Sequence, residues 1–324
     1  MRLRLAGVLL TLTLAACGDE HAAQDPADGG PPVDAASVPD AGPSPDAAPE
    51  ADRRGQVQVL EVTSYWKDGN GHVMAAAYGT ISARFLDVAE PRWQHQTMAS
   101  GACRLFTWEP AFCQQPCSGI CVETDVCQPW PHYLNAGTLT VSGLAVPATT
   151  LARDPLFNVY TYQLPHPATE LFADDATVEI AASGDTLPAL SARARGVPTI
   201  VPAIVDGLIT LDNHVDHTIH WTPAPGSDAR VQVTLNANNT MHGGPYLAVI
   251  ECDAPDSAGA ITLPAAMVDA FPGTTFWFQC LGSDCPPSWI RRYHETAMPR
   301  AGGGYDSLVV GSELRFYVEH HLQP

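Results

Sequence analysis

Five cysteines stand between residues 103 and 127, in the stretch CRLFTWEPAFCQQPCSGICVETDVC. Cysteines at this density serve as metal ligands, as a redox pair or as disulfides. From residue 113 onward the spacing is C-x3-C-x3-C-x5-C, which lacks the paired C-x2-C units common in structural zinc sites. The compartment in which the protein folds decides among these chemistries, because oxidising compartments favour disulfides.

The first seventeen residues, MRLRLAGVLLTLTLAAC, predict export. Two arginines precede an apolar run that is too short to span a bilayer, which takes about 20 residues, and such a run is typical of a signal peptide. The run ends in LAAC, which resembles a lipobox and predicts acylation of Cys17. Acyl chains anchor a protein to a membrane without a spanning helix. We therefore expect residues 1–17 to be a lipoprotein signal peptide with its lipobox cysteine, in which Cys17 is lipidated and becomes the mature N-terminus. Gly18 after this cysteine favours the outer membrane or cell surface as the destination.

Export leaves eight further cysteines to form disulfides, and they fall into two odd-numbered groups. The groups are Cys103, Cys113, Cys117, Cys121 and Cys127, and Cys252, Cys280 and Cys285. If every thiol is paired, at least one bond joins the two groups. We expect a local Cys280–Cys285 bond, a long-range bond between Cys252 and Cys103, and pairing of the other four among themselves. The alternative is one free thiol in each group.

Metal binding is the second candidate chemistry, in DNHVDHTIHW at residues 212–221. On a single strand, His214, Asp216 and His220 would share one face and offer three ligands to zinc. Residues four apart on a strand lie about 13 Å apart, however, so the imidazoles would have to lean far inward to share an ion. We expect a polar, solvent-facing strand here, with no bound metal and no other cofactor.

A weaker cation candidate is the pair Asp253 and Asp256 in DAPDSAG, where a side-chain-stabilised turn is the simpler interpretation. The sequence contains no G-x-S-x-G nucleophile elbow, phosphate-binding loop or dinucleotide fingerprint. We therefore assign no catalytic residue.

After the signal peptide, the chain divides into two segments of different composition, and the candidate residues lie in the second. Residues 18–54 are rich in Pro, Ala and Asp and contain no aromatic residue, which predicts a disordered tether. In the remaining residues apolar side chains alternate with polar ones, as in Val231, Val233 and Leu235, and turn signals separate the runs. This pattern predicts an all-β body, with one short helix in LPAAMVDAF.

The body is long enough for two antiparallel β-sandwich domains of immunoglobulin-like type. We place the boundary in RGVPTIVPAIVDG, where two prolines interrupt an apolar stretch. The predicted domains are then residues 55–197, with a disulfide-rich insertion at 103–127, and residues 198–324.

Further stretches carry a resemblance: GTLTVSGL, LFADDATVEIAASGDTLPALSA, IHWTPAPGSDARVQVTL and IECDAPDSAGAITLPAAMV. Together with the lipobox and the tether, they resemble a group of uncharacterised lipoproteins abundant in myxobacteria. The similarity covers most of the chain, and its motifs describe strands and corners. The resemblance thus implies an exported β body and carries over no catalytic residue.

The charge and the missing catalytic motifs narrow the function. A net charge of −19 argues against nucleic acid as a partner. We expect a non-enzymatic lipoprotein that displays its body for a binding or structural role, with a protein or glycan ligand. The alternative is an extracellular hydrolase or metal-dependent enzyme with a site assembled from loops. A concave pocket with convergent polar groups would favour the enzyme, and an exposed apolar or aromatic patch would favour binding.

Tryptophans are the candidates for a sugar-stacking platform. Those that flank turns, and could therefore be exposed, are Trp66, Trp93, Trp108, Trp130 and Trp289. Trp221 and Trp277 lie in strand-like runs and are expected in the core, where large aromatic side chains contribute most by burial.

Overall fold

The computed structural model describes residues 52–67, 72–163, 170–238, 244–274 and 288–320. All of them belong to one compact unit that begins at Asp40. Their regular secondary structure is nearly all β-strand, with 54% of residues in strands and 4% in helix, which confirms the predicted all-β class. The signal peptide, Cys17 and the tether up to residue 51 lie outside the described residues.

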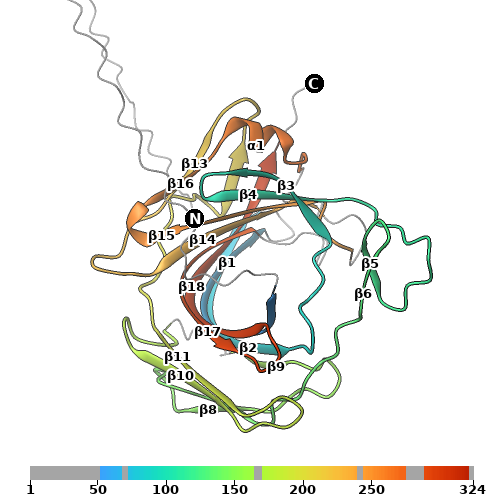
Figure 1. Ribbon diagram of the computed structural model, residues 1–324. Helices are drawn as coiled ribbons and strands as arrows, with labels where there is room; N and C mark the ends of the chain where they lie inside the picture. The colour runs from blue at the N-terminus through green and yellow to red at the C-terminus, as the bar shows by residue number, and fades with distance from the viewer. Residues whose placement is uncertain (1–51, 68–71, 164–169, 239–243, 275–287, 321–324) are drawn as a thin grey trace, which may run out of the picture. The chain divides into compact units, whose positions relative to one another are not determined.

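A ten-stranded main sheet organises the body, in the order β3-β4-β15-β14-β17-β18-β1-β2-β9, with β12 pairing with β18 beside this path (Figure 1). Its strands are β1 (Arg53–Lys67), β2 (Val73–Phe85), β3 (Gln94–Ser100), β4 (Cys103–Trp108), β9 (Tyr160–Gln163), β12 (Leu208–Leu211), β14 (Arg230–Asn236), β15 (Ala248–Pro255), β17 (Ser288–Pro299) and β18 (Tyr305–His320).

Two pairings in this sheet correct the expectation of purely antiparallel strands. β1 runs parallel to β18, with Val59 opposite Val310, and β12 also runs parallel to β18. A tight hairpin forces its two strands to be antiparallel, whereas strands joined by a long connection are free to pair in parallel. β1 and β18 are the first and last strands, so nearly the whole body connects them.

The sheet also does not follow the expected domain boundary at residues 197/198. Strands from both sides of that point, such as β1 and β18, pair within it. The segment that contains the expected boundary is bonded to the sheet: the Ile200 amide donates to Ser312 Oγ at 3.0 Å. Its two prolines lie in an irregular stretch between strands, which contains only a single bridge from Pro202 to Trp221.

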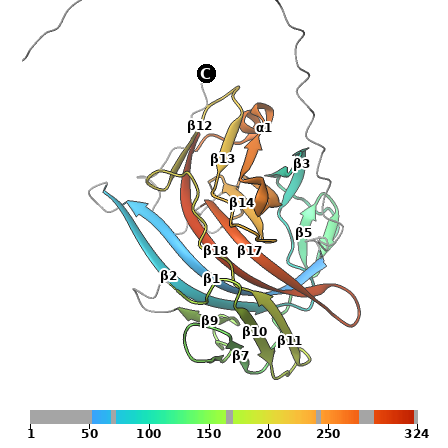
Figure 2. The same ribbon diagram turned by 90° about the vertical axis from the view of Figure 1, so that its left-hand side faces the viewer.

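One face of the long strands buries two separate cores. Along β18 alternate side chains point to the same face. Leu308 and Val310 enter the first core, and Leu314 and Phe316 enter the second. Figures 1 and 2 show different elements covering the two ends of this face.

A four-stranded antiparallel sheet covers the first core, in the order β11-β10-β7-β8. Its strands are β7 (Leu139–Ser142), β8 (Thr149–Leu151), β10 (Thr177–Ala182) and β11 (Leu190–Arg195). The alternating residues Leu139, Val141, Val178 and Ile180 are all fully buried in this core, as their spacing predicts.

A smaller cover closes the second core. It consists of the two-stranded sheet of β13 (His217–His220) and β16 (Ala260–Leu263) and the helix α1 (Ala265–Ala270). Pro264 caps α1 at its N-terminus, so the helix predicted in LPAAMVDAF is confirmed. The 3-10 turn η2 (Asp256–Ala258) connects β15 to β16. The last pair, β5 (Ile120–Glu123) and β6 (Val126–Gln128), forms a hairpin.

The opposite face of the main sheet carries both apolar and charged residues. Leu60, Val62, Tyr293 and Val309 form a small cluster there. Beside it the Glu313 carboxylate accepts hydrogen bonds from Arg291 and Arg315, and these guanidinium groups lower its pKa despite the burial that opposes them. The buried carboxylate is therefore fully paired, which favours a structural role for it.

Candidate functional site

The clustered cysteines are disulfide-bonded. Cys113 is bonded to Cys121 and Cys117 to Cys127, which ties the segment around the β5–β6 hairpin. A third bond joins Cys103 in β4 to Cys252 in β15 across a sequence separation of 149 residues. The expected long-range bond is thus present, and its two cysteines face each other on adjacent strands. Cys280 and Cys285 lie outside the described residues.

The structure does not bring the three candidate zinc ligands onto one strand. His214 lies in a turn with a positive φ of 65°, and its Nδ1 lies 2.9 Å from Asp269 Oδ2. Asp216 Oδ1 accepts a hydrogen bond from the Ala265 amide at the start of α1, at 2.7 Å. His220 alone lies on β13. Among the described residues no group of three His, Cys, Asp or Glu side chains is placed to hold a metal ion.

The second cation candidate is occupied by an arginine. Nε and Nη2 of Arg292 donate to Asp256 Oδ1 at 3.0 and 2.9 Å, and the Ala224 amide donates to Asp256 Oδ2 at 2.8 Å. Both charged side chains are almost completely buried. Asp253 is paired with Arg230, which opposes the rise in its pKa that burial causes. Neither carboxylate is left free for a cation.

The guanidinium of Arg292 also satisfies carbonyl groups in the segment of the expected boundary and after β13. It donates to the Pro198, Thr199 and Thr222 carbonyl oxygens at 3.2, 3.0 and 2.5 Å. The Trp221 indole donates to the Asp256 carbonyl oxygen at 2.9 Å, and Trp221 is buried as expected. These bonds fix the chain on either side of residues 203–220.

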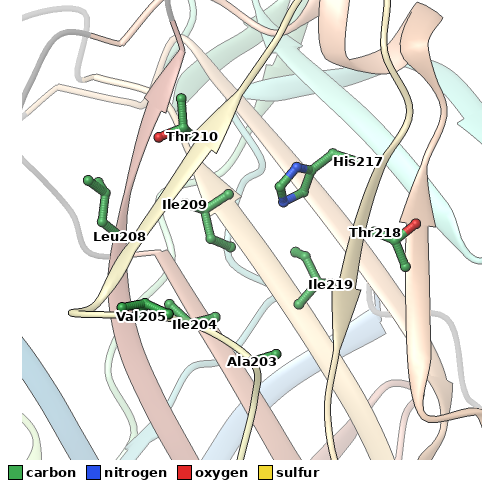
Figure 3. Close-up of a pocket in the computed structure, with 9 residues that line it drawn as sticks. All are labelled: Ala203, Ile204, Val205, Leu208, Ile209, Thr210, His217, Thr218 and Ile219. Carbon is green, nitrogen blue, oxygen red and sulfur yellow. The ribbon is translucent and has the colours of Figure 1, made fainter. Parts of the chain in front are cut away.

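Residues 203–219 form a pocket at the edge of the second core, with a volume of about 210 Å³ (Figure 3). Its lining is mostly aliphatic and comes from the segment before β12, from β12 and from β13. The lining residues are Ala203, Ile204, Val205, Leu208, Ile209, Thr210, His217, Thr218 and Ile219. Figure 3 shows Ile209 on one side and His217 and Ile219 on the other, pointing toward one another.

Gly207 makes the bend into β12 feasible. Its φ is +65°, and a Cβ at this position would lie 2.3 Å from Cβ of Tyr65 in β1. β1 pairs with β18 up to Arg315, and β12 then pairs with the same edge of β18 from Tyr317. A side chain at position 207 would clash with β1 where β12 takes over this edge.

The pocket lining contains no lysine or arginine. Burial lowers the pKa of the His217 imidazole, and the Asp212 carboxylate opposes this only in part. His217 is therefore neutral at neutral pH. No lysine or arginine occurs between residues 196 and 229, whereas Asp206 and Asp212 flank β12.

Val205, which lines the pocket, is 76% exposed. An exposed aliphatic side chain at a hollow lined by isoleucines is suited to an interaction site. In the sequence, Ile204, Ile209 and Ile219 resemble ordinary core residues, so no local signal marks this site.

The tryptophans considered for a sugar-stacking platform are only partly exposed. Trp130 is 56% exposed and Trp66 and Trp93 are just under 40%, while Trp108 and Trp289 are half-buried. The Trp289 ring stacks on the Arg291 guanidinium, whose carbon lies 4.4 Å from the ring centroid. Trp277 lies outside the described residues.

No protein-family model, curated protein or solved structure matches this chain. Within the described ranges, none of the helices has the length and hydrophobicity that a bilayer crossing requires. The function must therefore be argued from the residues of this chain.

Proposed function

We propose that this chain is an exported lipoprotein, anchored through Cys17 at the outer membrane or cell surface, whose β body binds a ligand without catalysing a reaction. The observation that carries the binding part is the mostly aliphatic lining of the pocket, with the exposed Val205 at its rim. A pocket whose one titratable lining residue is a neutral histidine is suited to holding an apolar group.

Other features support export and display. The three disulfides suit an oxidising compartment, since cytosolic reductants keep thiols reduced. The acidic, proline-rich residues before the body suit a spacer that holds it away from a membrane surface. The LAAC motif supplies the acylation site.

Cys17→Ser tests the anchor. Cells expressing the full chain are labelled with radioactive palmitate and fractionated. We expect the parent to carry label and sediment with membranes, and the variant to lose the label and appear in the soluble fraction. Cys113→Ser with Cys121→Ser is the matched control, because it also removes cysteines but leaves the lipobox intact. A Cys17→Ser variant that stays with membranes as the parent does would refute the anchor.

A further inference from the structure

The pocket lies between two strand edges. Among the described strands, β12 pairs only with β18, and β13 only with β16. Thr210 of β12 and Thr218 of β13 both line the pocket. Residues 201–203 already bond to the other edge of β13 at its C-terminal end, through the Ala203 amide and the Pro202–Trp221 bridge, so only the part of that edge before His220 is considered for a ligand. The direction of the main-chain groups follows from the hydrogen bonds of neighbouring residues.

On β12 the Gly207 carbonyl accepts from the Tyr317 amide of β18 at 2.8 Å. Main-chain groups alternate in direction along a strand, so Ile209 and Leu211 also face β18, and Thr210 faces away from it. The Leu208 amide agrees with this alternation, because it donates to the Val205 carbonyl instead of to β18. The amide and carbonyl of Thr210 therefore face the pocket side.

On β13 the His220 carbonyl accepts from the Ala203 amide at 2.9 Å, so His220 faces away from β16. Thr218, two residues earlier, faces the same way. Its side chain supports this assignment: Oγ1 of Thr218 lies 2.9 Å from Oγ1 of Thr262, as expected for a closely spaced, non-hydrogen-bonded pair. The amide and carbonyl of Thr218 thus also face the pocket side.

The size and charge of the pocket restrict its occupant. At about 210 Å³ it is smaller than the ~300–1,000 Å³ of ordinary small-molecule sites, so it suits one large side chain better than a long acyl chain. Main-chain donors and acceptors at Thr210 and Thr218 match another main chain, since extended peptides bind by adding to strand edges. Asp206 and Asp212 favour cationic groups around the anchor and disfavour anionic lipids.

We propose that the pocket binds an extended peptide segment of a partner protein. One large apolar side chain enters between Ile209, His217 and Ile219. The peptide main chain bonds at Thr210 or Thr218, and lysine or arginine residues beside the anchor lie near Asp206 and Asp212. This inference rests on the proposed binding function.

A selection from displayed random decapeptides tests the proposal on the full-length protein in detergent. Val205→Arg serves for counter-selection, because Val205 is exposed and lines the pocket, so an arginine there blocks the entrance and repels cations. We expect the enriched sequences to share one Leu, Ile, Met or Phe with Lys or Arg within two positions. Enrichment of sequences without this pattern, or no enrichment over Val205→Arg, would overturn the proposal.

Affinity measurements on the best peptide then separate the contributions. Replacing the anchor by Ala should weaken binding at least tenfold, since the buried side chain supplies most of the apolar contact. Methylating the amide nitrogens beside the anchor should weaken it severalfold through lost main-chain bonds. Leu156→Arg is the matched protein control: it places the same charge on an aliphatic side chain that is as exposed as Val205 but lies outside the pocket lining, and it should change affinity less than threefold.

Decanoate and phosphatidylglycerol vesicles form the lipid arm of the experiment. If they bind in a manner that Val205→Arg abolishes and the peptides do not, the peptide inference is wrong and the binding function stands. If neither peptides nor lipids depend on Val205, both the inference and the assignment of binding to this pocket are wrong. The membrane anchor remains open to its own test at Cys17.

Discussion

The two ends of the main sheet bury cores of similar composition under very different covers. The first core lies under four strands, β7, β8, β10 and β11, whereas the second lies under β13, β16 and a helix of six residues. The second core contains the Cys103–Cys252 bond and borders the buried Arg292–Asp256 pair. The disulfide joins neighbouring strands of the main sheet below the smaller cover, and the ion pair links η2 to β17.

The same difference explains where the pocket lies. A full second sheet packs its side chains against the face below it. In the first core, the Tyr160 hydroxyl also donates to the Gly137 carbonyl oxygen at 3.0 Å, which links the main sheet to the segment before β7. Over the second core, β13 and β12 leave a hollow between their edges. The crosslinked end of the molecule is therefore the one that offers a binding site.

The largest effect is expected from removing the long-range disulfide. Cys103→Ser with Cys252→Ser should lower the free energy of unfolding by about 5 kcal/mol in the chain-entropy account, because the bond closes a loop of 149 residues. Urea unfolding followed by tryptophan fluorescence measures the change. Before reduction, peptides containing the two cysteines should also travel together in mass spectrometry.

Cys113→Ser with Cys121→Ser is the control for this prediction. That bond closes a loop of only 8 residues, so about half the loss is expected. If the two double variants lose the same stability, the idea that the second core depends on its long-range crosslink is wrong.

Breaking the buried ion pair should come next. Asp256→Asn leaves the Arg292 charge buried without its partner, which typically costs about 3–5 kcal/mol of unfolding free energy. Glu179→Gln breaks the exposed Arg193–Glu179 pair on the cover of the first core and should cost less than about 1 kcal/mol. If urea titrations show the same loss of unfolding free energy in both variants, the two ends of the sheet do not differ in their dependence on ion pairs.

The smallest effect is expected at Glu61, beside the first core. Burial raises the pKa of this carboxyl group, although the Leu171 and Phe172 amides donate to it and oppose the shift. The folded protein therefore binds the proton more tightly than the unfolded chain. The contribution of Glu61 to stability is therefore complete below its unfolded pKa of about 4.5 and is lost as pH rises through its folded pKa.

Glu61→Gln should abolish this decline and change stability at pH 7 by no more than about 1 kcal/mol, because the side chain retains an oxygen acceptor. Urea titrations between pH 4 and 8 measure the slope. Glu61→Ala is the control: it leaves two buried amides without their acceptor and should cost about 1–3 kcal/mol across the range. A parent-like slope in Glu61→Gln would place the titrating group elsewhere.

Several elements were predictable because their signals are local. Alternation identified the inward residues of β7, β10, β14 and β18, and Pro264 marked the start of α1. Parity predicted a bond between the two groups of cysteines if every thiol is paired, and the structure forms that bond between Cys103 and Cys252. These conclusions needed only side-chain periodicity, backbone preference and counting.

The candidate histidine site was not predictable in the same way. Residues 212–221 have the alternation of one strand, but the structure places a turn at residues 213–215 and begins β13 at His217. The Asp269 side chain of α1 holds that turn by accepting from the His214 amide at 2.7 Å. Asp269 is 55 positions away in the sequence, so periodicity within the stretch carried no sign of it.

The sequence by itself determined the strand-forming segments, the odd number of cysteines in each group and the acidic stretch without lysine or arginine from residue 196 to 229. Only the tertiary structure decided that β1 pairs in parallel with β18, that the halves share one sheet, and that β12 and β13 leave a pocket between their edges. The physical reason is that main-chain hydrogen bonds are the same for every residue type. Sequence shows which segments become strands, and the packing of the whole chain selects which edges meet and which stay apart.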